Sequence, residues 1–127
     1  MSLIARFPEE TTDVFVRHFN EGDVDRLIAA YYAEGAVLAA TPGAAAAGRE
    51  LRSALAKYFE LGGKMKATTR HALIAGDTAL LVIDWVIDAI GPDGKALQVP
   101  GTSTDVVRRG ADGTWRCIID NPHNIKS

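Results

Sequence analysis

The chain has little cysteine and histidine, no excess of positive charge and no long apolar run. A single cysteine, Cys117, occurs among 127 residues. Because one cysteine cannot form an internal disulfide, the class of small secreted domains held together by disulfides is excluded. No uninterrupted apolar segment approaches the roughly 18 residues that a membrane helix needs, so no membrane association is expected. Residues 1–20 also lack a basic start followed by an apolar stretch, and the cytoplasm is the predicted location.

Charge and histidine spacing exclude two further classes. Fourteen basic and sixteen acidic side chains give a net charge of −2, and the basic residues are scattered, so no nucleic-acid partner is expected. His18, His71 and His123 are far apart in the sequence and have neither i, i+4 spacing nor a cysteine partner. This pattern is not typical of a metal site, and we expect neither a metal nor a cofactor.

The composition is that of a folded globular chain, with 47% hydrophobic residues. The length predicts one domain over residues 1–127. Apolar residues at helical spacing predict three helices in the first half, of which the first ends at Gly22. Asp23 is expected to cap the second helix, and Gly62 to stop the third. The Ala44–Ala47 run is interpreted as a loop or the approach to the third helix.

The second half changes to the pattern of strands. Segments 66–74, 77–90, 95–109 and 114–120 are rich in β-branched and apolar residues. They are separated by "AGD", "GPDG" and "GADG", which are turn sequences. This order predicts an antiparallel four-stranded meander after a short strand in "GAVLAATPG". Helices followed by strands indicate an α+β fold in which the helices cover one face of a curved sheet.

Several stretches together carry a resemblance to a known family. They are "FNEGDVDRLIAAYYAEGAVLAATPG", "GRELRSALAKYF", "GDTALLVIDWVID" and "TDVVRRGADGTWRCIIDNP". Nearly the whole chain resembles the SnoaL-like branch of the nuclear transport factor 2-like superfamily, which also contains ketosteroid isomerases. The resemblance implies a cone-shaped α+β barrel with three N-terminal helices packed on a curved, mostly antiparallel sheet. It also implies a pocket between a helix and the concave side of that sheet.

The resemblance matches the ketosteroid isomerase catalytic set only in part. By motif, Asp105 stands where that family keeps a protonated acid. The position of the family's base falls at Ala40 and Thr41, neither of which can abstract a proton at neutral pH. The position of its oxyanion tyrosine falls at Phe15. If Asp105 faces apolar walls its pKa should be raised, and if it pairs with an arginine its pKa should be lowered.

The last strand supplies a second candidate, Asp120. Strand alternation predicts that Arg116, Ile118 and Asp120 share one face, opposite Cys117 and its neighbours. The resemblance implies that Asp120 faces the pocket, because SnoaL-like cyclases carry their acid/base aspartate on the last strand. A carboxylate among aromatic side chains would suit proton transfer. The alternative is that Asp120 bonds to the Asn121-Pro122 turn and has no chemical role.

The remaining candidates are predicted to line the pocket. Of two consecutive tyrosines, Tyr31 and Tyr32, only one is expected to face the core. His71 points either into the pocket or to a structural partner. The proposed catalytic residues are Asp120 and Asp105. The proposed ligand-binding residues are Phe15, Phe19, Tyr32, His71, Trp85, Asn121 and His123.

Two classes of function are consistent with these residues, and a third class is a weaker alternative. The first is an isomerase-like or cyclase-like enzyme that acts on a small apolar molecule with Asp120 as acid/base. The second is a non-catalytic binder of such a molecule, and the third is an association module. A cavity of about 300 Å³ or more would favour a ligand over a filled cone. A homodimer through the outer sheet face is also expected, with Val82, Asp84 and Val86 as candidates at the interface.

Overall fold

The computed structural model describes residues 4–123. Three helices and six strands follow one another along the chain. They are α1 (Glu10–Glu21), α2 (Val24–Tyr31), β1 (Tyr32–Thr41), β2 (Ala44–Ala47), α3 (Arg49–Phe59), β3 (Lys64–Ala75), β4 (Thr78–Ile90), β5 (Ala96–Arg109) and β6 (Trp115–Asn121).

The first two helices are bounded as the sequence predicts. Gly22 has a positive φ of 78°, and its N–H bonds the carbonyl of Phe19 to close α1. The Asp23 side chain accepts a hydrogen bond from the N–H of Arg26 at 3.0 Å, which caps α2. These two residues therefore turn the chain sharply between the helices.

The sheet has the strand order β2-β1-β6-β5-β4-β3. Strands β3 to β6 form the predicted antiparallel meander, and β1 pairs with β6 in the parallel direction. The interpretation of Ala44–Ala47 as a loop or helix approach was wrong, because this run is β2, an edge strand paired with β1. The small side chains of this strand lack the alternation of apolar and polar residues by which a strand is recognised in a sequence.

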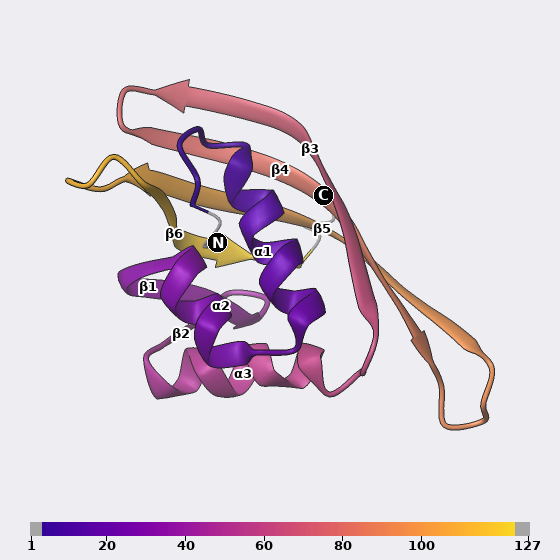
Figure 1. Ribbon diagram of the computed structural model, residues 1–127. Coiled ribbons are helices and arrows are strands. Elements are labelled where there is room, and N and C mark those ends of the chain that lie inside the picture. Colours follow the sequence, from indigo (N-terminus) through magenta and orange to yellow (C-terminus); the bar gives the residue numbers. More distant parts are fainter. Residues whose placement is uncertain (1–3, 124–127) are drawn as a thin grey trace.

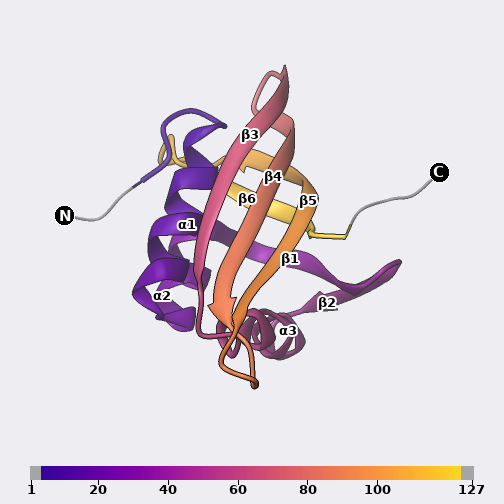
Figure 2. The same ribbon diagram turned by 90° about the vertical axis from the view of Figure 1, so that its right-hand side faces the viewer.

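The helices and the sheet form two layers of a cone. Figure 1 shows α1 and α2 against the concave side of the sheet, with α3 across one end. In Figure 2 the curved strands β3, β4 and β5 sweep past these helices, and the hairpin that joins β4 to β5 projects beyond them. The α+β class and the packing of three helices on a curved, mostly antiparallel sheet are confirmed. Among residues 4–123, no helix is long and apolar enough to cross a bilayer.

The core fills the space between the layers. On β4, alternate residues face the helices, and Leu81 and Ile87 are fully buried there. Val82 and Asp84 lie on the opposite, outer face of the strand and are only partly buried. Since apolar burial is the main stabilising term, this inner face anchors the meander to the helices.

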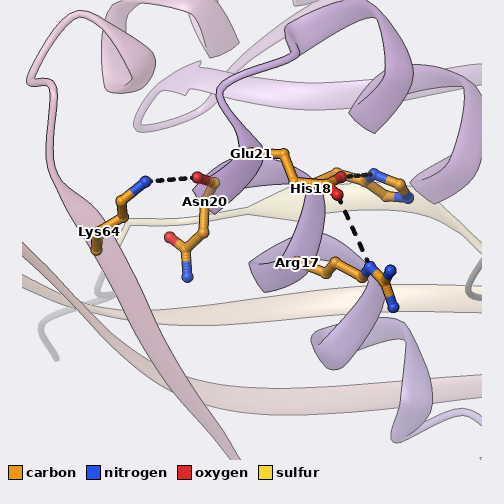
Figure 3. A network of polar contacts seen from close by, with 5 residues as sticks. All are labelled: Arg17, His18, Asn20, Glu21 and Lys64. Atoms are coloured by element: carbon orange, nitrogen blue, oxygen red, sulfur yellow. Dashed lines mark hydrogen bonds and ion pairs between the residues drawn. The ribbon is translucent and has the colours of Figure 1, made fainter.

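Asn20 fastens α1 to the edge of the sheet. Its side chain accepts a hydrogen bond from the N–H of Met65 at 2.7 Å and donates one to the Met65 carbonyl at 3.0 Å. Because β3 is an edge strand, these backbone groups have no strand partner on that side. Figure 3 shows Lys64 reaching the Asn20 carbonyl, and Glu21 between Arg17 and His18 on the helix.

Asn20→Ala should therefore lower the free energy of unfolding by about 2 kcal/mol. The change removes two partly buried hydrogen bonds, each worth about 1 kcal/mol. The control is Arg17→Ala on the same helix, which loses only an exposed ion pair and should change stability by less than about 0.5 kcal/mol. Urea unfolding of both variants measures the difference. Equal stabilities would show that Asn20 does not anchor the helix.

Candidate functional site

A cavity of about 50 Å³ lies between the helices and the concave face of the sheet. It is smaller than the 300 Å³ that the sequence analysis set as the criterion for a ligand, so its volume favours the filled cone over a ligand pocket. Several wall residues are partly exposed, including Val16, Tyr58 and Pro122, and they connect the cavity to the surface. The wall is formed by Thr12, Phe15, Val16, Tyr31, Leu38, Leu55, Tyr58, Met65, Ala67, Ile83, Trp85, Ser103, Asp105, Asp120 and Pro122.

Asp120 faces this cavity because β6 contains a bulge. The pairing with β5 shifts between Val107↔Cys117 and Val106↔Ile119. Asp120 therefore faces the pocket, as the sequence analysis expected, but the prediction that it shares a face with Arg116 and Ile118, opposite Cys117, was wrong. Cys117 is fully buried and Asp120 is 5% exposed, whereas Ile119 is 46% exposed. The extra residue changes the alternation within the strand, so both Cys117 and Asp120 point inward.

Asp105 and Asp120 are direct partners across β5 and β6. Both are buried, and both line the cavity. Each carboxylate accepts a hydrogen bond from a tyrosine hydroxyl at 2.5 Å, Asp105 from Tyr31 and Asp120 from Tyr32. Asp105 also accepts the backbone N–H of Asn121 at 3.3 Å. Two carboxyl groups thus sit side by side among apolar walls, with a phenol on each.

The expectation that only one of Tyr31 and Tyr32 faces the core was wrong. Tyr31 is 2% exposed and Tyr32 is 6% exposed. Helix α2 ends at Tyr31, and Tyr32 has extended backbone with φ −93° and ψ 138°. This change of backbone between neighbours lets both rings turn inward, where they meet edge to face at 4.9 Å. Tyr31 lines the cavity, and Tyr32 reaches it only through Asp120.

Burial raises the proton affinity of both carboxyl groups in the pair. Burial raises the pKa of Asp105 well above its ordinary value, and the negative charge of Asp120 raises it further. Burial also raises the pKa of Asp120, but hydrogen bonds from Asp105 and Tyr32 oppose this rise. The two carboxyls therefore titrate as a coupled pair, in which each group's pKa is raised and one proton is shared. Burial also raises the pKa values of Tyr31 and Tyr32, so both hydroxyls remain donors.

This arrangement places an acid and a base next to each other. Asp120 can accept a proton, and Asp105 can donate a hydrogen bond or a proton to a neighbouring oxygen. Two carboxyls that share one proton are a recurring solution for proton transfer near neutral pH, because both cannot ionise together. The site therefore has the elements of general acid–base chemistry without a nucleophile such as a reactive thiol. Burial raises the pKa of the Cys117 thiol, which favours its protonated form.

The turn after β6 is held by Asn121. Its side-chain oxygen accepts the N–H of His123 at 3.3 Å, and its amide donates to Thr104 at 3.3 Å. Within residues 4–123, the Asp120 side chain bonds Tyr32 and not this turn. The alternative contact with the backbone near Asn124 lies outside the described residues. Asn121 reaches the carboxyl pair through its backbone N–H alone.

The other predicted pocket residues separate into two groups. Phe15 and Trp85 line the cavity. Phe19 is buried beside it against Phe59, with ring centroids 4.7 Å apart. His123 is half-buried, with its Nε2 at 2.9 Å from the carbonyl oxygen of Ala39, and it does not line the cavity.

His71 lies on the outer face of the sheet, in contrast to its predicted place in the pocket. The register of β3 against β4 shifts between Thr69↔Ile83 and His71↔Val82. The bulge places His71 beside Val82, which faces outward, and the histidine is exposed. This correction removes His71 from the candidate ligand contacts.

Sequence reasoning missed several wall residues. Ser103 is two residues before Asp105 on β5, so strand alternation around that aspartate would have found it. Thr12 bonds Thr69 at 2.7 Å and joins α1 to β3 at the cavity. Tyr58 lies on α3, a helix that the sequence analysis did not connect with the pocket. Among the described residues, no three His, Cys, Asp or Glu side chains gather as a metal centre would require.

Comparison with known proteins supports this architecture. The family model described as the SnoaL-like domain matches residues 13–118. Functionally curated proteins gave no significant match.

Solved structures share the fold at low sequence identity. One is a nuclear transport factor 2-like protein with a cystatin-like fold from Novosphingobium aromaticivorans, with TM-score 0.74 and 18% identity over 94% of this chain and 80% of that chain. A ketosteroid isomerase-like protein from Erwinia carotovora atroseptica has TM-score 0.69 and 19% identity over 95% and 100%. A nuclear transport factor 2-like superfamily protein from Salmonella enterica serovar Typhimurium has TM-score 0.65 and 14% identity over 94% and 90%.

The buried pair predicts an unusual dependence of stability on pH. The native pKa values of Asp105 and Asp120 lie above the unfolded value of about 3.9. The native state then binds more protons than the unfolded state, so their contribution to stability is greatest below about pH 4 and falls as pH rises through the native pKa values. Asp105→Asn cannot ionise and can still donate to Asp120. This variant should be more stable than the wild type at pH 7, with the difference narrowing towards pH 4.

Asp84→Asn is the matched control for this measurement. Hydrogen bonds from Arg70 and Thr102 lower the pKa of Asp84, so its contribution has the opposite sign and is present above the unfolded pKa. Urea unfolding at pH 4, 5.5 and 7 separates the two variants. A wild type more stable than Asp105→Asn at pH 7 would contradict the buried-pair interpretation.

Proposed function

The chain belongs to the SnoaL-like domain family, and on this premise we propose that it binds a small, mostly apolar carbonyl compound and moves a proton on it. The superfamily includes isomerases and cyclases, whose chemistry begins with such a proton transfer. One observation carries the proposal, which is that Asp105 and Asp120 are buried side by side in the wall of an apolar cavity.

The proposed step uses the two carboxyls in different roles. Asp120 takes a proton from the carbon next to the carbonyl, and the electrons of that C–H bond move to the carbonyl oxygen. Asp105 donates its hydrogen bond or proton to this oxygen. The Tyr31 hydroxyl holds Asp105 in position by donating a hydrogen bond to its carboxyl group. Because the carbon and the oxygen are close in an enolisable ketone, a neighbouring acid and base match the two ends of the reacting group.

This proposal replaces the catalytic set of the ketosteroid isomerases. Phe15 lines the cavity where that family's motif has its oxyanion tyrosine, and it offers no hydroxyl. Tyr31 enters the same cavity from the end of α2 and supplies a hydroxyl bonded to Asp105. A buried donor next to the site of developing charge is the element that oxyanion stabilisation needs. The base is proposed to be Asp120 on β6, since β1 carries none at Ala40 or Thr41.

Exchange of α-hydrogens in deuterated water tests the enzyme proposal without knowledge of the natural substrate. Wild-type protein should accelerate deuterium incorporation into cyclohexanone, measured by proton NMR. Asp120→Asn should reduce this acceleration by about 10²–10⁴-fold, because the amide keeps the shape and loses the proton acceptor. Asp84→Asn, on the outer face, is the control and should exchange like the wild type.

Absence of catalysed exchange by the wild type would contradict the enzyme proposal. If Asp84→Asn loses exchange as Asp120→Asn does, the reaction does not depend on the cavity. Binding of cyclohexanone without exchange would favour the alternative function, a non-catalytic binder with the same cavity. The small volume of the cavity favours the third function, an association module, and failure of cyclohexanone to bind would support it.

We also propose a homodimer through the outer face of the sheet. An apolar row crosses five strands on this face, because Leu73, Leu80, Val106, Ile119 and Val37 are successive cross-strand partners. Leu73 is 64% exposed and Ile119 is 46% exposed. Val82, Asp84 and Val86 extend the same face along β4. A twofold axis through such a face would bury the row against itself.

Sedimentation velocity at micromolar concentration tests this assembly. The wild type should sediment as a dimer, and Leu80→Lys should sediment as a monomer because it places a charge within the row. Phe7→Lys is the control, since Phe7 is an exposed apolar residue outside the sheet and its substitution should leave the dimer intact. A monomeric wild type would refute the proposal.

The proposed location is the cytoplasm. The single cysteine, Cys117, is buried and free, which is compatible with a reducing compartment.

A further inference from the structure

Ser103 presents a buried hydroxyl group to the cavity. The residue is 6% exposed and lines the cavity. Its neighbours Thr102 and Thr104 point outward, and the hydroxyl of each has a hydrogen-bond partner there. The Ser103 hydroxyl has no partner within residues 4–123, yet it is not sealed from water, because the one sealed atom without a partner is the Trp85 indole nitrogen. Buried hydroxyls in native proteins are usually paired, with protein or with ordered water.

The spacing along β5 separates this hydroxyl from the carboxyl pair by the length of a water bridge. Ser103 and Asp105 lie on the same face of the strand, two residues apart, which is about 7 Å along the backbone. A direct hydrogen bond spans about 3 Å, whereas one water molecule between two partners spans about 5.5 Å. A water molecule is therefore the group of the right size to bond both side chains.

The volume of the cavity matches this occupant. One water molecule needs about 10–15 Å³ of such space, so a cavity of about 50 Å³ admits only a few. A few molecules are much less water than surrounds an exposed carboxylate, so Asp105 and Asp120 keep raised pKa values and a shared proton. The partly exposed wall residues Val16, Tyr58 and Pro122 lie where these molecules enter.

The carboxyl pair has acceptor sites left for water. An ionised carboxylate offers about four lone-pair sites. Asp105 uses two of them for the hydroxyl of Tyr31 and the N–H of Asn121. Asp120 uses one for the hydroxyl of Tyr32. Further donors are therefore accommodated on both groups.

No permanent cation compensates the charge of this pair within the described residues. The ionisable groups that act on it come from every element around it, and none is a lysine or an arginine. They are Tyr31 on α2, Tyr32 on β1, Tyr58 on α3, Cys117 on β6 and His123 after β6. The charge that remains after one proton is shared therefore depends on neutral donors, and water is such a donor.

We propose that the cavity is a water site, in which Ser103 bonds a water molecule that also donates a hydrogen bond to Asp105 or Asp120. Ser103 is then a positioning residue, because it acts on the carboxyls through the water. Hydrogen bonds to a carboxylate favour its charged form, so this water opposes the rise in pKa that burial causes. The inference does not depend on the proposed function, since the same water would occupy a resting enzyme, a binder or an association module.

Ser103→Thr and Ser103→Val form a matched pair of variants for the test. Both introduce a β-branched side chain of nearly the same size, and only threonine keeps the hydroxyl. Valine loses the anchor of the water, so the pKa values of the pair should lie about one unit higher in Ser103→Val than in Ser103→Thr. Carbon-detected NMR of the aspartate carboxyl carbons measures this difference. Equal pKa values in the two variants would overturn the inference.

The stability of the same two variants has an opposite sign in a wet and in a dry cavity. With water present, the ratio of folded to unfolded protein at pH 7 should be about fivefold lower for Ser103→Val, which loses one buried hydrogen bond. In a dry cavity valine would replace an unpaired hydroxyl by an apolar group and would be the more stable variant. Urea unfolding decides between them, and a more stable Ser103→Val would contradict the water site.

A high-resolution crystal structure of the wild type tests the site without any substitution. An ordered water should lie within about 3.2 Å of the Ser103 hydroxyl oxygen and of a carboxyl oxygen of Asp105 or Asp120. A well-ordered cavity without this water would overturn the inference. Failure of cyclohexanone exchange would refute the enzyme proposal alone, and it would leave the water site standing.

Discussion

Burial of Asp105 and Asp120 opposite each other is the constraint on which the site depends. Two neighbouring carboxylates in an apolar cavity would repel each other and lack water, so the pair is stable only while a proton is retained between them. Tyr31 and Tyr32 complete the arrangement by donating one hydroxyl to each carboxyl. The end of α2, the bulge in β6 and the register of β5 all serve to bring these four side chains together.

Local residue chemistry was sufficient to predict much of the fold. Gly22 and Asp23 define the first two helices because positive φ and side-chain capping are short-range effects. The alternation of β4 likewise gave its inner and outer faces. The run Ala44–Ala47 was interpreted wrongly as a loop or helix approach, since four alanines carry no strand pattern and become a strand only by pairing with β1.

The candidate site was predictable in its residues and not in its geometry. The family resemblance identified Asp105 and Asp120 and gave the inward direction of Asp120, but the alternation wrongly placed Cys117 on the opposite face because it ignored the bulge in β6. Another bulge turns His71 outward. Bulges depend on how two strands fit together, so the sequence of one strand does not reveal them. Tyr31 and Tyr32 were separated for a similar reason, because the change from helix to strand between them is a property of the packed structure.

Direct titration of the two carboxyl groups tests the central claim most closely. Carbon-detected NMR of protein labelled at aspartate carboxyl carbons follows each group between pH 3 and 9, and Asp120→Asn assigns the signals. The account predicts that Asp105 titrates well above the ordinary value of about 3.9 and that its pKa falls when Asp120 loses its charge. Two independent titrations near 3.9, unaffected by the substitution, would contradict the shared proton and the chemistry proposed from it.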